Sequence, residues 1–497
     1  MRFEMARHLS GVRHSAHAAA LVHATKDSSA LSPPPEMNWR QYAIYLLSTA
    51  AEIEHALMVQ YLYAAYSIDL SSTAGGADPA FCQRVILGVA KEEMGHLITV
   101  QNVLRLLGAP LHLERDDYPV RSPFYPYMFH LEPVSLKTLA KFVVAESPEV
   151  WPDWVPADEK AKIMALATED AGATVVRVGE LYAELIRVLS DSAKVPDDEF
   201  RGETYPYQAS FDEYGRGYAA GARGDPRRTP PAPAAPRRFA SAPAAPPRTD
   251  PQLVAPNPND PAAATPDVLV VRAASRTDAV AALREIAEQG EAIEIVEAGS
   301  EDSHFVRFLN LFRRFEGGQS APSVLPLAVD PIIGDGGEDS DGRKIRNPEA
   351  ATWAALFNTR YRMLLSYLAH VYRHRSIAAA NGAPGRRGQL INRMFGEMYN
   401  LKSIASLLTA LSLDRDPKVR AGPPFQIPYT VALPEGELDI WRLHRDLVDA
   451  SLPLAKQLAR TSTAGAGYAQ ALVALDERAR SDFDLIIAGP PTAAQVA

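Results

Sequence analysis

Two segments far apart in the chain carry the same short motif, a glutamate followed three residues later by a histidine. The motifs are Glu93–His96 and Glu301–His304. On a helix this spacing places a carboxylate and an imidazole on one face, one turn apart. Each motif lies in an apolar stripe, where an ionisable group is costly unless it is paired or binds a metal. The pattern therefore restricts the chain to folds that bring these charged faces together inside a helical bundle.

Two further helical segments each offer a carboxylate that could complete such a site. Glu54 is the only charge on one apolar face, and Glu52 must point elsewhere. Glu180 lies beside an apolar stripe rather than within it, so Glu184 remains an alternative. Two such pairs plus a glutamate from each of two other helices form a carboxylate-bridged two-metal site. The predicted ligands, with Glu93 and Glu301 as the bridges, are Glu54, Glu93, His96, Glu180, Glu301 and His304.

The predicted ligand set also narrows the choice of metal. Four carboxylates and two imidazoles suit iron(II) or manganese(II) and are poor ligands for soft metals. With open coordination positions, two iron ions could bind O2 as a co-substrate, and manganese is the alternative metal. We expect Tyr61 to be a core residue rather than a redox-active one, and Asp302 to lie outside the ligand set.

The hydrophobic periodicity predicts a mainly α fold: a four-helix bundle with a long Pro/Ala-rich insertion and an additional C-terminal helical region. The bundle helices are expected at 39–67, 79–107, 159–190 and 294–315, with shorter helices at 135–145 and 275–289 and a short strand at 268–271. The C-terminal helices are expected at 353–379, 388–413, 436–460 and 465–487. In the first of these, His370 and His374 stand in a Tyr-Arg-His-Arg context that indicates a solvated face.

The length of 497 residues and the composition suggest several units. Thirteen of the 41 residues from Pro226 to Pro266 are proline, which prevents a packed core there. The expected units are an N-terminal arm at 1–38, a metal-binding bundle at 39–320 that includes the Pro-rich insertion at 200–266, and a C-terminal helical domain at 321–497.

The charge and cysteine content bound the partners. A net charge of −9 argues against nucleic acid as the main partner. The single cysteine, Cys82, excludes an intrachain disulfide and suits a reducing cytoplasm. The sequence has no apolar run of membrane-spanning length, so we expect no membrane partner. The expected partners are a small-molecule substrate and either a second copy of the chain or another biosynthetic enzyme.

At these motifs the chain resembles the ferritin-like superfamily, whose ligand pattern is a Glu-x-x-His pair on the second and fourth helices. More narrowly, it resembles the iminophenyl-pyruvate dimer synthase family, which includes the chromopyrrolate-type synthases of bisindole and violacein-type pigment pathways. The strings that carry this resemblance lie between residues 39 and 430 and include Ile53-Glu54-His55-Ala56, Lys91-Glu92-Glu93-Met94-Gly95-His96 and Val178-Gly179-Glu180-Leu181-Tyr182. The resemblance implies an amino-acid-derived substrate, of the imino- or keto-acid type, in secondary metabolism.

Three functions follow from this reading. The first is a non-haem dinuclear-iron oxidase or oxygenase, which the ligand set and the C-terminal half favour. The second is metal handling, either ferroxidase activity or manganese-dependent peroxide disproportionation, which needs the same site but no organic pocket. The third is a non-catalytic scaffold whose Pro-rich segment 226–266 tethers a partner. A scaffold, however, has no need to bury six ligand-type residues.

Overall fold

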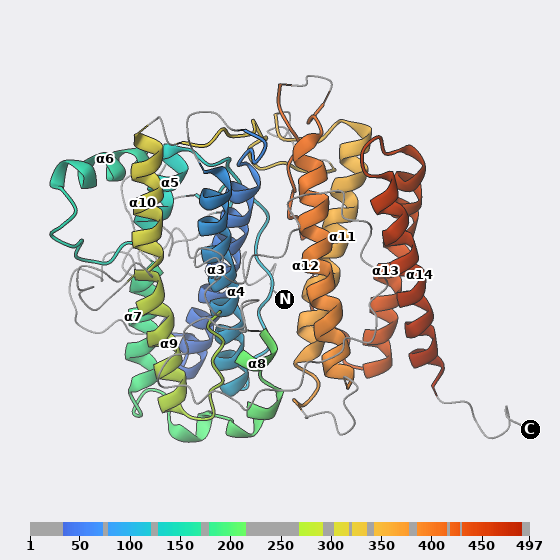
Figure 1. The fold of residues 1–497 in the computed structure, drawn as a ribbon. Helices are drawn as coiled ribbons and strands as arrows, with labels where there is room; N and C mark the ends of the chain where they lie inside the picture. The colour runs from blue at the N-terminus through green and yellow to red at the C-terminus, as the bar shows by residue number, and fades with distance from the viewer. Residues whose placement is uncertain are drawn as a thin grey trace, which may run out of the picture.

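The computed structural model describes residues 33–72, 78–120, 128–169, 178–214, 268–291, 303–317, 321–334, 342–376, 385–414, 418–427 and 430–489. Within these ranges the chain forms helices and isolated β-bridges but no strand, so the predicted mainly α fold class is confirmed. The Pro-rich segment 226–266 and most of the N-terminal arm lie outside the described residues. Figure 1 shows two groups of helices side by side, one containing α3 to α10 and the other α11 to α14.

The centre of the first group is a pair of long helices, α3 (Trp39–Tyr66) and α4 (Pro79–Leu106), which pack along each other. The side chain of Asn38 accepts a hydrogen bond from the Gln41 backbone and caps α3, while Asp78 caps α4. After α4 the chain turns at Gly108, whose φ of 66° suits a residue without a Cβ atom. Both helices thus lie close to their predicted positions.

The other two positions of the bundle are each filled by two shorter helices. α5 (Leu136–Ala145) packs against α10 (His304–Glu316), and α7 (Val178–Ser190) packs against α9 (Arg276–Glu291). In Figure 1, α5 and α10 lie above α7 and α9. The two breaks, between α5 and α7 and between α9 and α10, therefore fall at about the same level of the bundle.

The bounds of two predicted helices differ from the observed ones. The segment predicted as one helix at 159–190 contains α6 (Ala157–Thr168), which packs beside α5, and the separate α7. The helix predicted at 294–315 is described only from His304 onward. Between α7 and α9 lie two short 3-10 helices and a single helical turn, which are η3 (Asp197–Glu199), η4 (Gly202–Tyr207) and α8 (Phe211–Tyr214).

The strand predicted at 268–271 is wrong, because these residues form no regular secondary structure. The Val271 amide donates a hydrogen bond to the Thr99 hydroxyl, so this segment pairs with side chains of α4 rather than with a strand. A Cβ atom on Gly95 would lie 2.3 Å from the carbonyl oxygen of Leu269. Gly95 therefore allows segment 268–271 to pack directly on α4, next to His96.

The second group consists of four helices, α11 (Pro348–Val371), α12 (Arg386–Ala410), α13 (Glu437–Thr461) and α14 (Ala466–Ala488). α11 packs against both α12 and α13, and α13 packs against α14. The Tyr372 hydroxyl donates a hydrogen bond of 3.2 Å to the carbonyl oxygen of Ile98 and so connects the two groups. Contrary to the predicted solvated face, His370 is fully buried and His374 is half-buried. No helix in the described ranges has the length and apolar character needed to cross a membrane.

Candidate metal centre

Four of the six predicted ligands lie together at the level where the bundle helices are broken. Glu54 comes from α3, Glu93 and His96 come from α4, and His304 is the first residue of α10. Each of these side chains is at most 2% exposed. A fifth residue, Glu146, follows the last residue of α5 and joins them. The centre is therefore built from the interior of α3 and α4, from the first residue of α10 and from the residue that follows α5.

The five side chains form two groups of three potential ligands that share one member. One group is Glu54, Glu93 and His96, and the other is Glu93, Glu146 and His304. Within each group the ligand atoms lie within 4.8 Å of one another. Glu93 belongs to both groups, so its two carboxylate oxygens occupy the place that a bridging ligand requires.

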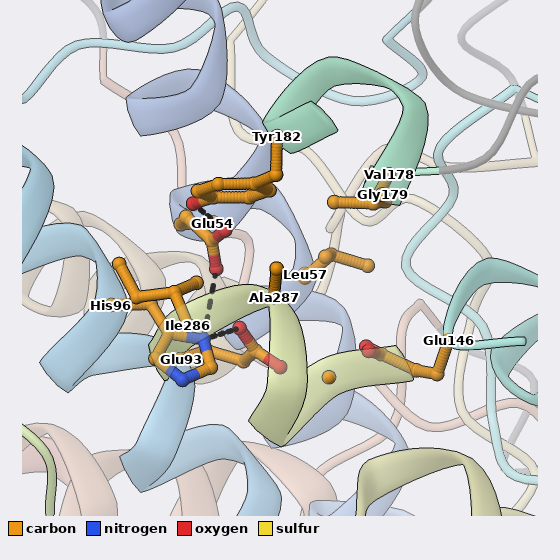
Figure 2. Close-up of a pocket in the computed structure, with 11 residues that line it drawn as sticks. Glu54, Leu57, Glu93, His96, Glu146, Val178, Gly179, Tyr182, Ile286 and Ala287 are labelled. Atoms are coloured by element: carbon orange, nitrogen blue, oxygen red, sulfur yellow. Dashed lines mark hydrogen bonds and ion pairs between the residues drawn. The ribbon is translucent and has the colours of Figure 1, made fainter. Parts of the chain in front are cut away.

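The distances in the two groups are similar. In the first group, His96 Nδ1 lies 3.0 Å from Glu93 Oε2 and 3.4 Å from Glu54 Oε2. In the second, His304 Nδ1 lies 2.8 Å from Glu93 Oε1 and 3.5 Å from Glu146 Oε2. Figure 2 shows Glu54, Glu93 and His96 converging on one another, with Glu146 pointing toward them from across the view. Each imidazole thus faces two carboxylates through its Nδ1 atom.

Several atoms at this centre are buried without a hydrogen-bond partner among the described residues. They are Glu54 Oε2, Glu93 Oε1 and His304 Nδ1. The last two are only 2.8 Å apart, yet they are not aligned as a hydrogen bond. Unsatisfied buried polar atoms are costly, and atoms that aim at one point satisfy a shared cation. The donor set of carboxylate oxygen and imidazole nitrogen therefore fits two metal ions such as iron or manganese.

The outer ring nitrogen of each histidine is held by an acceptor. His96 Nε2 donates to Gln289 Oε1 of α9 at 3.0 Å, and His304 Nε2 donates to Glu92 Oε2 at 2.8 Å. Such contacts fix the tautomer and orientation of a metal-binding histidine, leaving the opposite nitrogen free to bind the metal. The Glu92 carboxylate is also hydrogen-bonded by Arg307 of α10, whose Nη1 atom lies 3.2 Å from Glu92 Oε1.

Two buried tyrosines donate hydrogen bonds to the two carboxylates that belong to only one group each, Glu54 and Glu146. The Tyr182 hydroxyl of α7 donates to Glu54 Oε1, and the Tyr61 hydroxyl of α3 donates to Glu146 Oε1. Tyr61 is a buried residue of the core, as the sequence predicted, but its hydroxyl also positions a candidate ligand. Each of the two groups therefore has one tyrosine-bound glutamate, one shared glutamate and one histidine.

The electrostatics reflect an excess of buried acid. Burial raises the pKa of Glu93 well above its ordinary value, and the nearby Glu146 and Glu54 charges add to the rise. Burial opposes protonation of His304, but the Glu93, Glu146 and Glu92 carboxylates outweigh it and raise the pKa of that imidazole well above its ordinary value. Burial also opposes ionisation of Glu54, yet the adjacent His96 imidazole and the hydrogen bond from Tyr182 hold its pKa below the ordinary value. Protons thus compete with cations for this centre.

Neither candidate for the third-helix ligand lies in the two groups of described residues, so that ligand stays a prediction. Glu180 lies in the first turn of α7, is half-buried and is not part of either group, while Glu184 pairs with Arg187 at 2.6 Å. Glu146 supplies a carboxylate to the second group instead, because it directly follows α5, whereas α7 begins only at Val178. Its sequence signal was a glutamate directly after the apolar run Phe142–Ala145.

Two other predicted residues remain without a placement. The predicted bridge Glu301 lies outside the described residues, as does Asp302. The prediction that Glu301 bridges the metals is therefore still a prediction, and Glu93 is the shared carboxylate that the described residues provide.

A small cavity opens beside Glu54 and Glu146. Its apolar walls come from Leu57 of α3, from Val178 and Gly179 at the start of α7, and from Ile286 and Ala287 of α9. The cavity volume of about 20 Å³ has room for about one water molecule. A molecule of that size, such as O2 or peroxide, could therefore reach the carboxylates from this side.

The sequence is similar to a known protein family and to two characterised enzymes. Residues 47–216 match the ferritin-like family model, which confirms the predicted resemblance. Over 183 residues the chain is 30% identical to a 2-imino-3-(indol-3-yl)propanoate dimerase of Chromobacterium violaceum, covering 31% of this chain and 18% of the relative. Over 120 residues it is 32% identical to a dichlorochromopyrrolate synthase of Lentzea aerocolonigenes, covering 20% and 12%.

The matched segments thus span less than a fifth of either relative. The dichlorochromopyrrolate synthase is of the chromopyrrolate type that the narrower resemblance named. A solved structure of a ferritin-like protein from Caulobacter vibrioides aligns with a TM-score of 0.40 and 18% identity, over 75% of this chain and 98% of that one.

Proposed function

Because this chain contains a ferritin-like segment at residues 47–216, we propose that its buried centre binds two iron ions and uses O2 to oxidise a small amino-acid-derived substrate. The observation that carries this proposal is the shared position of Glu93. The Glu93 carboxylate lies between the two histidine-containing groups. Its Oε1 atom, Glu54 Oε2 and His304 Nδ1 have no hydrogen-bond partner among the described residues. A centre that only stabilised the fold would pair its charges internally.

The residues around the centre are suited to hold two cations at fixed positions. Glu93 would bridge them, with Glu54 and His96 on one side and Glu146 and His304 on the other. When bound, the two iron ions would pass electrons from the substrate to O2. Gln289 and Glu92 would keep Nδ1 of the two histidines directed inward. The apolar cavity wall would limit the water beside the carboxylates.

The names of the relatives support a 2-imino acid as the substrate class, because one of them is a dimerase of an indolyl 2-iminopropanoate. We propose a two-electron oxidation for this chain. The substrate would lose two electrons and two protons, and O2 would gain them to form H2O2. Oxygenation, in which an oxygen atom enters the product, is the alternative outcome of the same centre.

The test measures O2 uptake by the iron-loaded protein. The substrate is an aromatic 2-oxo acid with ammonium, which equilibrates with the 2-imino acid. Glu54→Gln removes a candidate ligand, whereas Glu52→Gln alters a half-exposed glutamate of the same helix that pairs with His112 at the surface. We expect uptake by the wild type and Glu52→Gln, and a rate at least about 100-fold lower for Glu54→Gln. Equal uptake by all three proteins would contradict the proposal.

The size of the cavity favours one other function, the handling of peroxide or of iron itself. A space of about 20 Å³ admits H2O2 but no aromatic acid. This alternative predicts rapid disproportionation of H2O2 by the manganese-loaded protein, or oxidation of successive iron(II) additions by O2, without any organic substrate. Either activity in the absence of substrate-dependent O2 uptake would replace the oxidase proposal.

A further inference from the structure

A second group of metal-binding side chains lies in the C-terminal helices. His370 is in the last turn of α11, His374 follows four residues later in the turn after the helix, and Glu437 is the first residue of α13. One ligand atom from each of the three lies within 4.8 Å of the others. None of these residues belongs to the bundle centre, so they form a separate group of potential ligands.

The spacing of these atoms matches the geometry of a tetrahedral metal. His370 Nε2 lies 3.2 Å from Glu437 Oε2 and 3.3 Å from Oε1, and His374 Nε2 lies 3.4 Å from Oε1. In a tetrahedral zinc site with bonds of about 2.0–2.1 Å, ligand atoms are about 3.3 Å apart. Two of the three ligand–ligand distances therefore already have the required length.

His374 is the member of the group that lacks another role. Its Nε2 atom is buried and has no hydrogen-bond partner among the described residues, although it faces the Glu437 carboxylate. The turn that presents His374 is held by Arg387, whose Nη1 atom donates to the carbonyl oxygens of His374 at 2.7 Å and Val371 at 2.8 Å. The ring is thus preorganised, although it makes no hydrogen bond of its own within the described structure.

The other two residues have supporting contacts of the kind found around metal ligands. His370 Nδ1 lies 3.0 Å from Nε2 of the buried His444, and Trp441 Nε1 donates to Glu437 Oε1 at 2.8 Å. When a metal replaces the proton on His370 Nε2, His370 Nδ1–H can donate to His444 and fix the ring.

We propose that His370, His374 and Glu437 bind a single Zn²⁺ ion that ties the end of α11 to the start of α13. Two imidazoles and one carboxylate are a common zinc ligand set, and the fourth position is open to water because Glu437 is 39% exposed. The competing cation is Arg386, 3.9 Å from Glu437 Oε1. Its side chain is 59% exposed, so it can leave the carboxylate for solvent.

The experiment measures zinc stoichiometry by competition with a chromophoric chelator, using the full-length protein. The bundle centre also binds zinc in this assay, so the readout is the difference between variants. We expect the wild type to bind about one Zn²⁺ per chain more than His374→Asn or Glu437→Gln. His112→Asn is the matched control, because His112 pairs with Glu52 at 2.6 Å and belongs to none of the three-ligand groups found among the described residues, and it should equal the wild type. Circular dichroism verifies that each variant is folded.

Cobalt provides an independent readout. Co²⁺ in a tetrahedral site absorbs strongly in the visible region, and this absorption should be present in the wild type and in His112→Asn but absent in His374→Asn. Equal zinc stoichiometry and equal affinity in all four proteins would overturn the proposal. A zinc equivalent bound no more tightly than about 1 mM would also overturn it, because it would be adventitious metal only.

Discussion

Both halves of this protein bury charge among four helical positions, but they neutralise it differently. In the C-terminal helices, Arg360 is fully buried and makes paired hydrogen bonds of 2.8–3.0 Å to Glu397 and Asp476. All four oxygens of these two acids have protein donors, including the Ser451 hydroxyl and the Asn400 amide. Every carboxylate oxygen of that network therefore has a donor without any further ion, although Arg360 Nε has no hydrogen-bond partner among the described residues.

The bundle centre has the opposite character. Four buried acids, Glu54, Glu92, Glu93 and Glu146, face two histidines and the single guanidinium of Arg307. The Arg307 charge is directed at Glu92, so among the described residues the other three acids have no basic partner except the histidines. The comparison shows that burial of charge alone does not identify a metal centre. What distinguishes this one is a set of carboxylate and imidazole atoms that converge on a point and have no hydrogen-bond partner among the described residues.

The largest expected effect would break the hydrogen-bonded network of the C-terminal half. Arg360→Met leaves Glu397 and Asp476 buried without their cation, which should lower the free energy of unfolding by about 3–5 kcal/mol. The exposed Arg442, paired with Asp439 at 2.6 Å, gives the control, and Arg442→Met should cost less than about 1 kcal/mol. Urea denaturation measures both values. Equal costs would mean that the buried network is not a stabilising unit.

A second variant pair sharpens the assignment of the bundle centre. Glu146→Gln removes a candidate ligand beside His304, so it should weaken binding of one of the two metals by more than about 100-fold. Glu180→Gln changes a half-buried glutamate outside both groups and should leave metal binding unchanged. Metal titration followed by elemental analysis distinguishes them. Loss of metal in Glu180→Gln alone would restore the ligand that the sequence predicted.

A smaller effect on metal affinity is expected from Glu92, which contacts the candidate ligand His304 but is not itself a candidate ligand. Glu92→Gln keeps an acceptor for His304 Nε2 but removes the charge that orients the ring and pairs with Arg307. Metal affinity should fall by about 10–100-fold while both sites still fill at high metal concentration. Isothermal titration calorimetry measures the change. A complete loss of one site would instead make Glu92 a direct ligand.

Periodicity in the sequence was sufficient for much of the fold. Helices with continuous apolar stripes and clear caps, such as α3 after Asn38 and α4 after Asp78, lie within one residue of their predicted ends. The same stripes brought Glu54, Glu93, His96 and His304 to one place, because a charge inside an apolar stripe must face the core. These residues depend only on local spacing.

The remaining site features depend on where the backbone breaks, which a helical period does not encode. Glu146 ends a short helix and reaches the centre only because α5 stops there, while Glu180 belongs to a second helix that begins afterwards. His370 illustrates a similar error, since polar neighbours in the sequence suggested solvent although α13 covers the ring in the folded protein. Long-range packing decided each of these cases.

The central claim is that the excess acid of the bundle holds two metal ions. The most direct test is elemental analysis after anaerobic loading with iron(II) and removal of unbound metal. We expect about two iron ions per chain in the wild type and in Glu52→Gln, and almost none in Glu93→Gln, because Glu93 is shared by both groups. A wild type that retains no iron, or a Glu93→Gln variant that retains both ions, would contradict the account.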